Sequence, residues 1–517
     1  MKIQNGKYQM SKNLIMNVLA YGVQFIISFY ISPKIVGAVG TSAYGFIGLA
    51  NDFVAYATII TSVFNSVASR FIANAFYQND NEKANHYFNS LISANLIMAG
   101  IFGAVSIALV PNLDKMLVID PKLVFDVKLT FALVFGSYII TLVTQVFTTS
   151  TFVTNRTDIQ GIRNIIQHVV RFACVILFLN FISVRIYWVS LAALIAATIV
   201  AVMNVGLTKK LTPELKVNLK YAKSSYVIEL AKSGCWMALT TISTILLRGL
   251  DLTVSNLMLG DYEMGVLSIA RTMPNNVTSI INTIAPLFTP VFISYFAKND
   301  TSGLVENIKK TIDKMAVIMF VPITGFIIFS YDFYSLWQKS LTKDEVFLIT
   351  MLSTITVVQA YFNSATATMA QISVVVNKLV LPVWISLGCG VLSLGIELLL
   401  LTFTNLGLYA IVLTPTIVMV ARYVIFNSIY AAYCLKQKKT CFLPRVIKTW
   451  LSIPILLGSM YVIRLVRPAS SWMWLAVDIV ICAAIGYALM FVIYDTKKVK
   501  KLFGKLKKNS SLFGDNG

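Results

Sequence analysis

Two stretches of the sequence repeat one another. Residues 40–50 read GTSAYGFIGLA and residues 260–270 read GDYEMGVLSIA, so that two glycines and an alanine recur at a constant offset of 220 residues. Each stretch opens an apolar segment that ends in Asn-Asp, at Asn79-Asp80 in the first copy and at Asn299-Asp300 in the second. The alignment needs no gap. An internal repeat of this kind predicts two similar halves within one chain.

The composition places both halves in a membrane. Of the residues, 57% are hydrophobic and 13% are charged, whereas about a quarter are charged in soluble domains. Apolar runs of about 20 residues are long enough to cross a bilayer as helices, which satisfy their own backbone hydrogen bonds. We predict an all-α polytopic membrane protein with about fourteen such helices, among them continuous spans at 228–259, 264–297 and 407–434.

The repeat organises these helices into two pseudo-symmetric lobes around a central cavity. Six helices separate the copies, an even number, so both copies enter the membrane in the same sense and their symmetry axis runs along the membrane normal. The predicted boundaries are an N-lobe at 1–208, a basic linker at 209–227, a C-lobe at 228–434, two additional helices at 435–494 and a basic tail at 495–517.

The charge follows the topology that this arrangement predicts. The net charge is +21, and its Lys and Arg residues gather in loops on the side of the N-terminus and in the tail. The positive-inside rule therefore predicts that both termini are cytoplasmic. Because topology and anionic lipids already account for this charge, we do not expect nucleic-acid binding. Two isolated histidines and no Cys-x-x-Cys predict no metal site, and we expect no cofactor.

Arginines inside predicted helices are the first candidate site residues. A charged side chain at mid-membrane costs about 3 kcal/mol on insertion scales, so it is retained mainly for function. We predict that these guanidinium groups line a cavity and bind a phosphate or a carboxylate. The alternative is local: Arg248 neutralises Asp251, three residues later on the same helical face, and Arg70 reaches the headgroups. The arginines are Arg248, Arg271, Arg422 and Arg70.

Acidic and amide side chains complete the candidate set. We assign Asp52 and Asp251 to coupling with Na⁺ or H⁺, and expect Glu397 and Asp478 to lie at the outer boundary of the membrane. Amides both donate and accept hydrogen bonds, as the hydroxyls of a sugar require, and hydrogen bonding between helices is the alternative. The amides assigned to substrate binding are Asn51, Asn275 and Asn276.

The Gly40-x4-Gly45 opening, its echo at Gly260 and Gly265, and the Asn-Asp loops resemble the polysaccharide flippases of the multidrug/oligosaccharidyl-lipid/polysaccharide exporter superfamily. The resemblance extends over the whole chain in helix count and repeat arrangement. It implies a flippase that moves a polyprenyl-diphosphate-linked oligosaccharide from the cytoplasmic to the outer leaflet of a bacterial inner membrane, with Arg248, Arg271 and Arg70 as cavity arginines.

Rival functions follow from the same residues. The first is a cation-coupled small-molecule or drug exporter of the same superfamily, driven by Na⁺ or H⁺. A lipid II flippase is less favoured because no arginine of the first helix matches that family. A membrane glycosyltransferase or polymerase is less favoured because the chain has no large outer loop or acidic catalytic cluster, so we predict no enzyme. The predicted partners are the lipid-linked oligosaccharide and membrane lipids, and the question of a glycan polymerase or glycosyltransferases stays open.

Overall fold

The chain is mostly helical in the part that the computed structural model describes, residues 6–154, 156–466 and 471–494. No strand occurs in these ranges. The predicted tail at 495–517 lies outside them. In a membrane no water is present to bind the backbone, so an apolar chain forms helices, which satisfy their own hydrogen bonds. The prediction of an all-α protein is confirmed.

Thirteen helices of the described residues are long and apolar enough to cross a membrane. They are preceded by α1 (Gly6–Val39), whose described apolar part is the shorter segment Phe25–Val39. The structure therefore supports the prediction of about fourteen spans.

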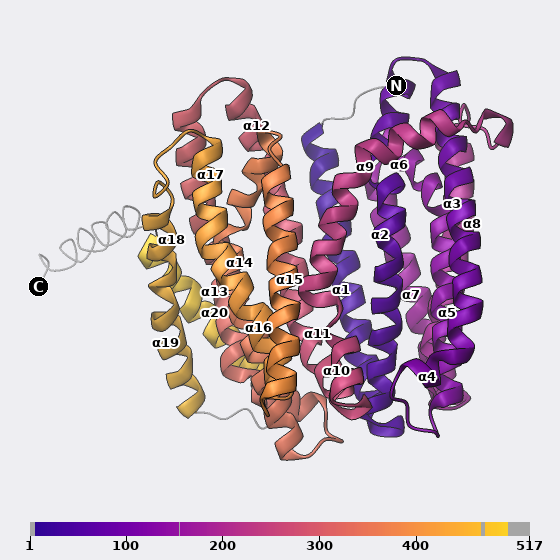
Figure 1. Ribbon diagram of the computed structural model, residues 1–517. Helices are drawn as coiled ribbons and strands as arrows, with labels where there is room; N and C mark the ends of the chain where they lie inside the picture. Colours follow the sequence, from indigo (N-terminus) through magenta and orange to yellow (C-terminus); the bar gives the residue numbers. More distant parts are fainter. Residues whose placement is uncertain (1–5, 155, 467–470, 495–517) are drawn as a thin grey trace, which may run out of the picture. The chain divides into compact units, whose positions relative to one another are not determined.

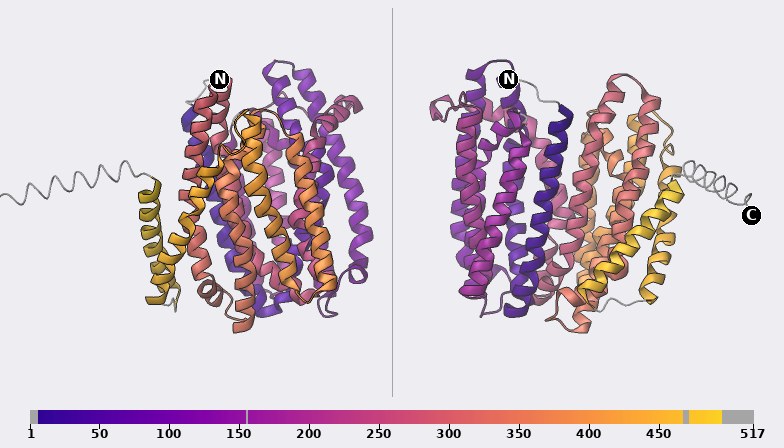
Figure 2. Two further views of the ribbon diagram at one scale, coloured as in Figure 1. Left: turned by 60° about the vertical axis from the view of Figure 1, so that its left-hand side comes forward. Right: turned by 180° about the vertical axis from the view of Figure 1, so that it is seen from behind.

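The chain divides into two compact units, each a bundle of helices lying side by side (Figures 1 and 2). Unit 1 comprises the chain up to Ile269 together with Val383–Ile411, and unit 2 comprises Ala270–Pro382 and the chain from Val412 onward. The boundary passes within three helices: α11 (Asp261–Ile284), α15 (Val380–Phe403) and α16 (Leu408–Ala421). The boundaries that the sequence predicted for the lobes stay predictions.

Unit 1 is built on neighbouring helix pairs, of which α5 with α8, α2 with α9, and α1 with α7 pack most extensively. Besides α1 and the shared helices, its helical segments are α2 (Thr41–Tyr77), α3 (Asn81–Leu109), η1 (Val110–Asn112), α4 (Leu113–Met116), α5 (Val124–Thr144), η2 (Gln145–Thr148), α6 (Thr149–Val153), α7 (Thr157–Phe181), α8 (Ile186–Leu211), η3 (Leu219–Tyr221), α9 (Ser224–Thr244), η4 (Ile245–Gly249) and α10 (Asp251–Met258).

Unit 2 is built around one long helix, α13 (Thr301–Trp337), which packs on α14 (Lys343–Val375), α19 (Ser452–Val466) and α20 (Trp472–Tyr494). Its core is apolar, with Phe320 of α13 fully buried. The remaining segments are η5 (Ala285–Phe288), α12 (Thr289–Ala297), η6 (Arg422–Asn427), α17 (Ser428–Cys434) and α18 (Leu443–Trp450).

The two copies of the repeat adopt the same backbone conformation at both ends. Gly40 and Gly260 precede α2 and α11 with φ of 100° and 130°, values that favour glycine. At the other end Asn79 and Asn299 have φ of 58° and 54°. The aspartate that follows each asparagine then caps the next helix, because its carboxylate accepts a backbone N–H three residues later, at 2.9 Å in the first copy and 2.8 Å in the second.

The repeat also explains how α2 and α11 approach each other. A Cβ on Gly45 would lie 2.8 Å from the Cα of Gly265, its counterpart 220 residues later. One turn further on, a Cβ on Gly48 would lie 2.8 Å from Oγ of Ser268, again its counterpart. Equivalent positions at the starts of the two copies therefore face each other within unit 1.

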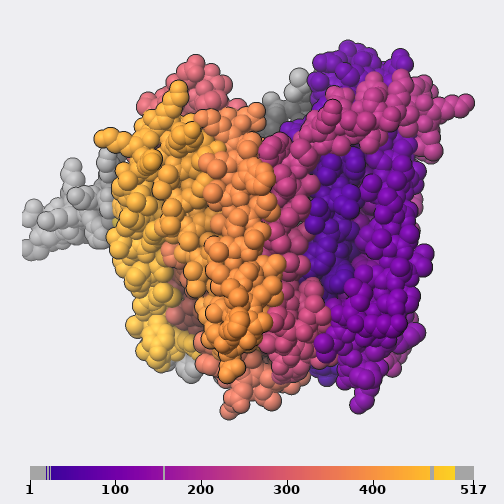
Figure 3. Space-filling view, viewed as in Figure 1, coloured from indigo at the N-terminus to yellow at the C-terminus, as the bar shows by residue number. Residues whose placement is uncertain are grey.

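The linker between the halves is bound tightly to α3. Asn85 donates to the Glu214 carbonyl at 2.8 Å and accepts from the Lys216 N–H at 2.8 Å. Asn89 repeats this pattern one turn later with Lys216 and Asn218, at 2.9 and 2.7 Å. The space-filling view shows the linker and the start of α9 lying across the end of this helix bundle (Figure 3). The linker is therefore an ordered part of unit 1.

Candidate functional site

Two of the predicted continuous spans are interrupted by a wider turn, and each interruption contains a candidate arginine. In the described residues, Ile245–Gly249 and Arg422–Asn427 form π-helical turns, which include Arg248 and Arg422. A π turn inserts a residue into the α-helical ladder and frees backbone groups, and such turns are frequent at functional sites. The prediction of one regular helix over 228–259 was therefore wrong, because the π turn lies between α9 and α10, whereas the shared face of Arg248 and Asp251 stays a prediction.

A side chain of α2 hydrogen-bonds to the π turn that contains Arg248. The Tyr56 hydroxyl lies 2.6 Å from the carbonyl oxygen of Gly249, to which it donates, and 2.8 Å from Oγ1 of Thr253. The widened turn exposes a carbonyl that a regular helix would have satisfied internally, and the tyrosine satisfies it instead. A side chain from the repeat helix thus stabilises the break beside the arginine.

A second helix of unit 1, α15, brings an acid to the same turn. A Cβ on Gly390 would lie 2.8 Å from Leu246 Cβ, so this glycine is what allows α15 to approach the turn. Two helical turns later the Glu397 side chain is 3% exposed and lies within electrostatic reach of Asp251. The small residues of this helix face bury Glu397 against the protein, and its position at the outer boundary of the membrane stays a prediction.

The remaining candidates of unit 1 lie along α2. The Asn51 side chain is exposed but its amide donates to the Ile47 carbonyl at 2.6 Å, within its own helix, and Asp52 beside it is half-buried. Arg70 is exposed and follows Asn51 by nineteen residues in α2, which places it about 28 Å further along the helix. Arg70 therefore does not join the other candidates of this unit.

In unit 2 the candidates lie on two helical segments. Arg271 and Asn275 are one turn apart on α11 and so share a face, with Arg271 half-buried and Asn275 exposed. Asn276 donates to the Thr272 carbonyl at 2.8 Å, which occupies one of its donors within the helix. Nε of Arg422 is buried without a hydrogen-bond partner in the described part of the chain. A guanidinium in that state suits an anionic ligand.

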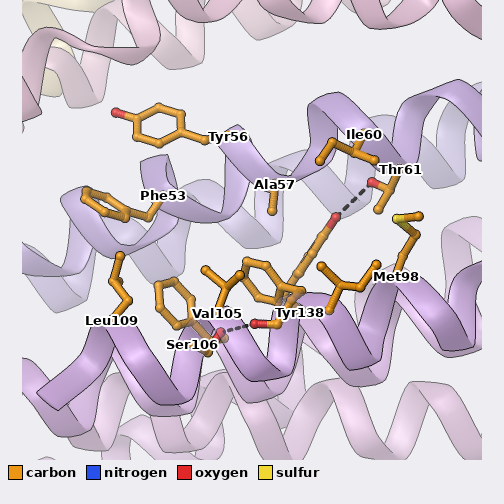
Figure 4. A pocket seen from close by; sticks show the side chains of 13 residues that line it. Phe53, Tyr56, Ala57, Ile60, Thr61, Met98, Val105, Ser106, Leu109 and Tyr138 are labelled. Atoms are coloured by element: carbon orange, nitrogen blue, oxygen red, sulfur yellow. Dashed lines mark hydrogen bonds between the residues drawn. The ribbon is translucent and has the colours of Figure 1, made fainter.

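An apolar pocket of about 260 Å³ lies between α2, α3 and α5, and it contains none of the predicted site residues (Figure 4). Its wall includes Phe53, Phe102 and Phe135. The hydroxyls in it are already paired, since Thr61 and Tyr138 lie 2.8 Å apart. Such a lining suits hydrocarbon and offers little to a sugar.

Comparison with known proteins assigns the family. Residues 10–296, more than half of the chain, match the family described as "Polysaccharide biosynthesis protein". The chain belongs to this polysaccharide biosynthesis family. A curated family relative, the uncharacterized membrane protein EpsK of Bacillus subtilis (strain 168), is 26% identical over 435 residues, which cover 84% of this chain and 85% of EpsK.

Solved structures show which fold this family member adopts. A multidrug resistance MATE family transporter in an inward-facing conformation aligns with a TM-score of 0.67 at 13% identity, over 82% of this chain and 99% of its own. The lipid II flippase MurJ in an inward closed conformation aligns with a TM-score of 0.67 at 12% identity, over 94% of this chain and all of its own (100%). The family member therefore has the fold of the MOP superfamily.

Sequence reasoning missed the roles of Tyr56 and Glu397. Glu397 ends a row of small residues, Ser386, Gly390 and Ser393, spaced at three and four positions. That spacing places them on one helix face, and small residues on one face allow a neighbouring helix to approach closely. Reading this row would have predicted that the glutamate is buried between helices. No comparable pattern marks Tyr56.

Proposed function

We propose that this chain moves a polyprenyl-diphosphate-linked oligosaccharide from the cytoplasmic to the outer leaflet of a bacterial inner membrane by alternating access. The observation that supports this most is the pair of π-helical turns at Arg248 and Arg422, in a family member with the fold of membrane transporters. Irregular backbone at membrane depth is tolerated where it lines a cavity or is buried in protein. On this proposal both termini are cytoplasmic.

The arginines supply what a diphosphate headgroup requires. A guanidinium remains charged at every physiological pH and donates two parallel N–H bonds to phosphate oxygens. The buried Nε–H of Arg422 is available as a donor, and Arg271 lies one helical turn from the exposed amide of Asn275. The amide would then contact the glycan beside the anchored headgroup. A membrane potential that is negative inside favours outward movement of an anion by about 2.3 kcal/mol per charge per 100 mV.

Charge reversal tests the proposal. Arg248→Glu, Arg271→Glu and Arg422→Glu should each abolish surface glycan in cells that lack the native copy, because an acid repels the diphosphate. Arg248→Lys should retain part of the export, since it keeps the charge but loses the two-pronged geometry, with a loss of about tenfold to a hundredfold.

Arg70→Glu is the matched control, because that exposed side chain lies far along α2 from the other candidates of its unit. Immunoblots of membrane fractions establish that each variant is inserted. Wild-type glycan in all three reversal variants would refute the assignment of the arginines.

A cation-coupled exporter is the second candidate, and one observation favours it. Glu397 and Asp251 are two acids in electrostatic contact, and Oε1 of Glu397 is buried without a hydrogen-bond partner among the described residues. Carboxylates between transporter helices are typical ligands of Na⁺ and H⁺. A deletion strain separates the candidates: changed drug tolerance with normal surface glycan supports the exporter, and lost glycan with normal tolerance supports the flippase.

A further inference from the structure

Three charged side chains meet inside unit 2, on three helices that carry none of the arginines discussed above. Asp332 is on α13, Arg464 on α19 and Asp478 on α20, and these three helices pack against one another (Figures 1 and 2). Arg464 contacts α13 at two points: its Nε lies 3.0 Å from Oδ2 of Asp332, and its Nη1 donates to the Ile328 carbonyl at 2.8 Å. The arginine therefore neutralises one carboxylate of the three-residue group.

The second carboxylate of the group, that of Asp478, has no hydrogen-bond partner among the described residues. The Asp478 side chain is 1% exposed, and neither of its oxygens has a hydrogen-bond partner in the described residues. More than nine in ten buried polar groups have such a partner. Asp478 lies about 9 Å along α20 from its first residue, well inside the helix. Its helix face is packed against the protein, and its position at the outer boundary of the membrane stays a prediction.

The charged and titratable groups near Asp478 come from all three helices. From α13 it faces Asp332, near enough for the two carboxylates to repel each other. The only charge from α19 is Arg464, which Asp332 and a carbonyl already hold. On its own helix the next titratable group is the thiol of Cys482, one turn later and 2% exposed. Among these groups of the described residues, one positive and two negative charges leave a net charge of −1 beside a buried carboxylate, which needs a counter-charge.

We propose that Asp478 binds one monovalent cation, a proton or Na⁺, and that this cation fastens α19 and α20 to α13. Either cation brings the single positive charge that the group lacks and satisfies the unpartnered carboxylate oxygens. When the cation leaves, the bare carboxylate repels Asp332 and loosens the contact of α20 with α13. The site is independent of the arginines proposed for the substrate and requires no glycan.

The experiment uses the full-length purified protein in lipid nanodiscs without substrate, and its two arms distinguish the cations. In the first arm, thermal unfolding is compared in NaCl and in choline chloride at equal ionic strength. If Na⁺ is bound, NaCl should raise the melting temperature of the wild type by about 2 °C but leave Asp478→Asn unchanged. In the second arm, infrared spectra in Na⁺-free buffer should show the C=O band of a protonated carboxyl group that shifts in D₂O and is absent from Asp478→Asn.

Matched variants sharpen the result. Asp344→Asn, at an exposed position in the first turn of α14, should keep whichever signal the wild type shows. Asp332→Asn should abolish that signal, because it releases Arg464 to neutralise Asp478 directly. Asp478→Ser replaces Asp478→Asn if the latter does not fold. The proposal is overturned if the wild type shows neither signal, or if the signal survives in the folded Asp478 variant.

Discussion

The two copies of the repeat, residues 40–95 and 260–315, share their ends but differ in their interiors. Both begin after a glycine with positive φ and both turn at an asparagine with positive φ followed by a capping aspartate. In the interior, Asn65 and Asn95 exchange two amide hydrogen bonds, of 3.0 and 3.1 Å. The residues 220 positions later are Ala285 and Met315, both in the apolar core of unit 2.

This difference teaches which part of the repeat determines the fold. Backbone conformation at the helix ends determines where the helices lie. Either a polar or an apolar pair of side chains can then fill the space between two helices. In the first copy the amide pair also holds a third helix, because Asn95 donates to the Leu142 carbonyl of α5 at 3.1 Å. The first copy is therefore held by specific hydrogen bonds and the second by packing.

The largest expected effect comes from the glycines at which the copies meet. Gly265→Ala places a Cβ against the carbonyl oxygen of Thr41, and Gly45→Ala places one 2.8 Å from a backbone Cα. Backbone cannot yield as a side chain can, so each should lower the free energy of unfolding by about 3 kcal/mol or more. Thermal unfolding of the purified protein measures this. Gly100→Ala and Gly325→Ala, where a Cβ meets nothing within 4 Å, are the controls. Equal stability of all four variants would contradict the close contact of α2 with α11.

The next effect breaks the amide pair. Asn95→Met leaves the Asn65 amide without its partner in the protein interior, so we expect a loss of about 1–3 kcal/mol. The double variant Asn65→Ala/Asn95→Met recreates the pair found in the second copy and should recover part of that loss. A double-mutant cycle on thermal unfolding measures the coupling. Strictly additive losses would show that the two amides act independently.

A smaller effect tests whether the copies are equivalent at their caps. Asp80→Ala and Asp300→Ala each remove one N-cap hydrogen bond, and each should lower the free energy of unfolding by about 1 kcal/mol. The two values should agree within about 0.5 kcal/mol, since the backbone N–H bond is the same in both copies and the additional Ser302 hydroxyl bond of Asp300 is exposed. Thermal unfolding of both variants under one condition provides the comparison. A large difference would mean that one cap has a role that the other lacks.

The smallest effect concerns the asparagines with positive φ. Asn79→Gly and Asn299→Gly keep the left-handed conformation accessible, so stability should change by no more than about 0.5 kcal/mol. Asn79→Val and Asn299→Val should cost about 1–2 kcal/mol more, because a β-branched side chain resists that conformation. The difference in melting temperature between the glycine and valine variants isolates the backbone term. If the glycine and valine variants had the same melting temperature, the two asparagines would not adopt the left-handed conformation.

Much of the fold follows from the sequence because hydropathy and the repeat are long-range signals. Gly40, Gly260 and the two Asn-Asp pairs predicted the repeated ends of the helices correctly. The π turns at Arg248 and Arg422 could not be predicted, since an inserted residue changes neither the hydropathy nor the length of a span appreciably. Burial of Glu397 and Asp478 was missed because distance from a helix end was used to place them, although the packing of neighbouring helices determines it.

The hydrogen bonds from Asn85 and Asn89 to the linker determine which changes of linker sequence and length the protein tolerates. Both amides contact main-chain atoms of Glu214, Lys216 and Asn218, so the exposed side chains of Glu214 and Lys216 can be replaced without loss of these bonds, whereas Leu215 between them is buried in the core of unit 1. The length of the linker cannot vary so freely, because one inserted or deleted residue would put every later N–H and C=O out of step with α3. Tags and cleavage sites should therefore be introduced by substitution rather than by insertion.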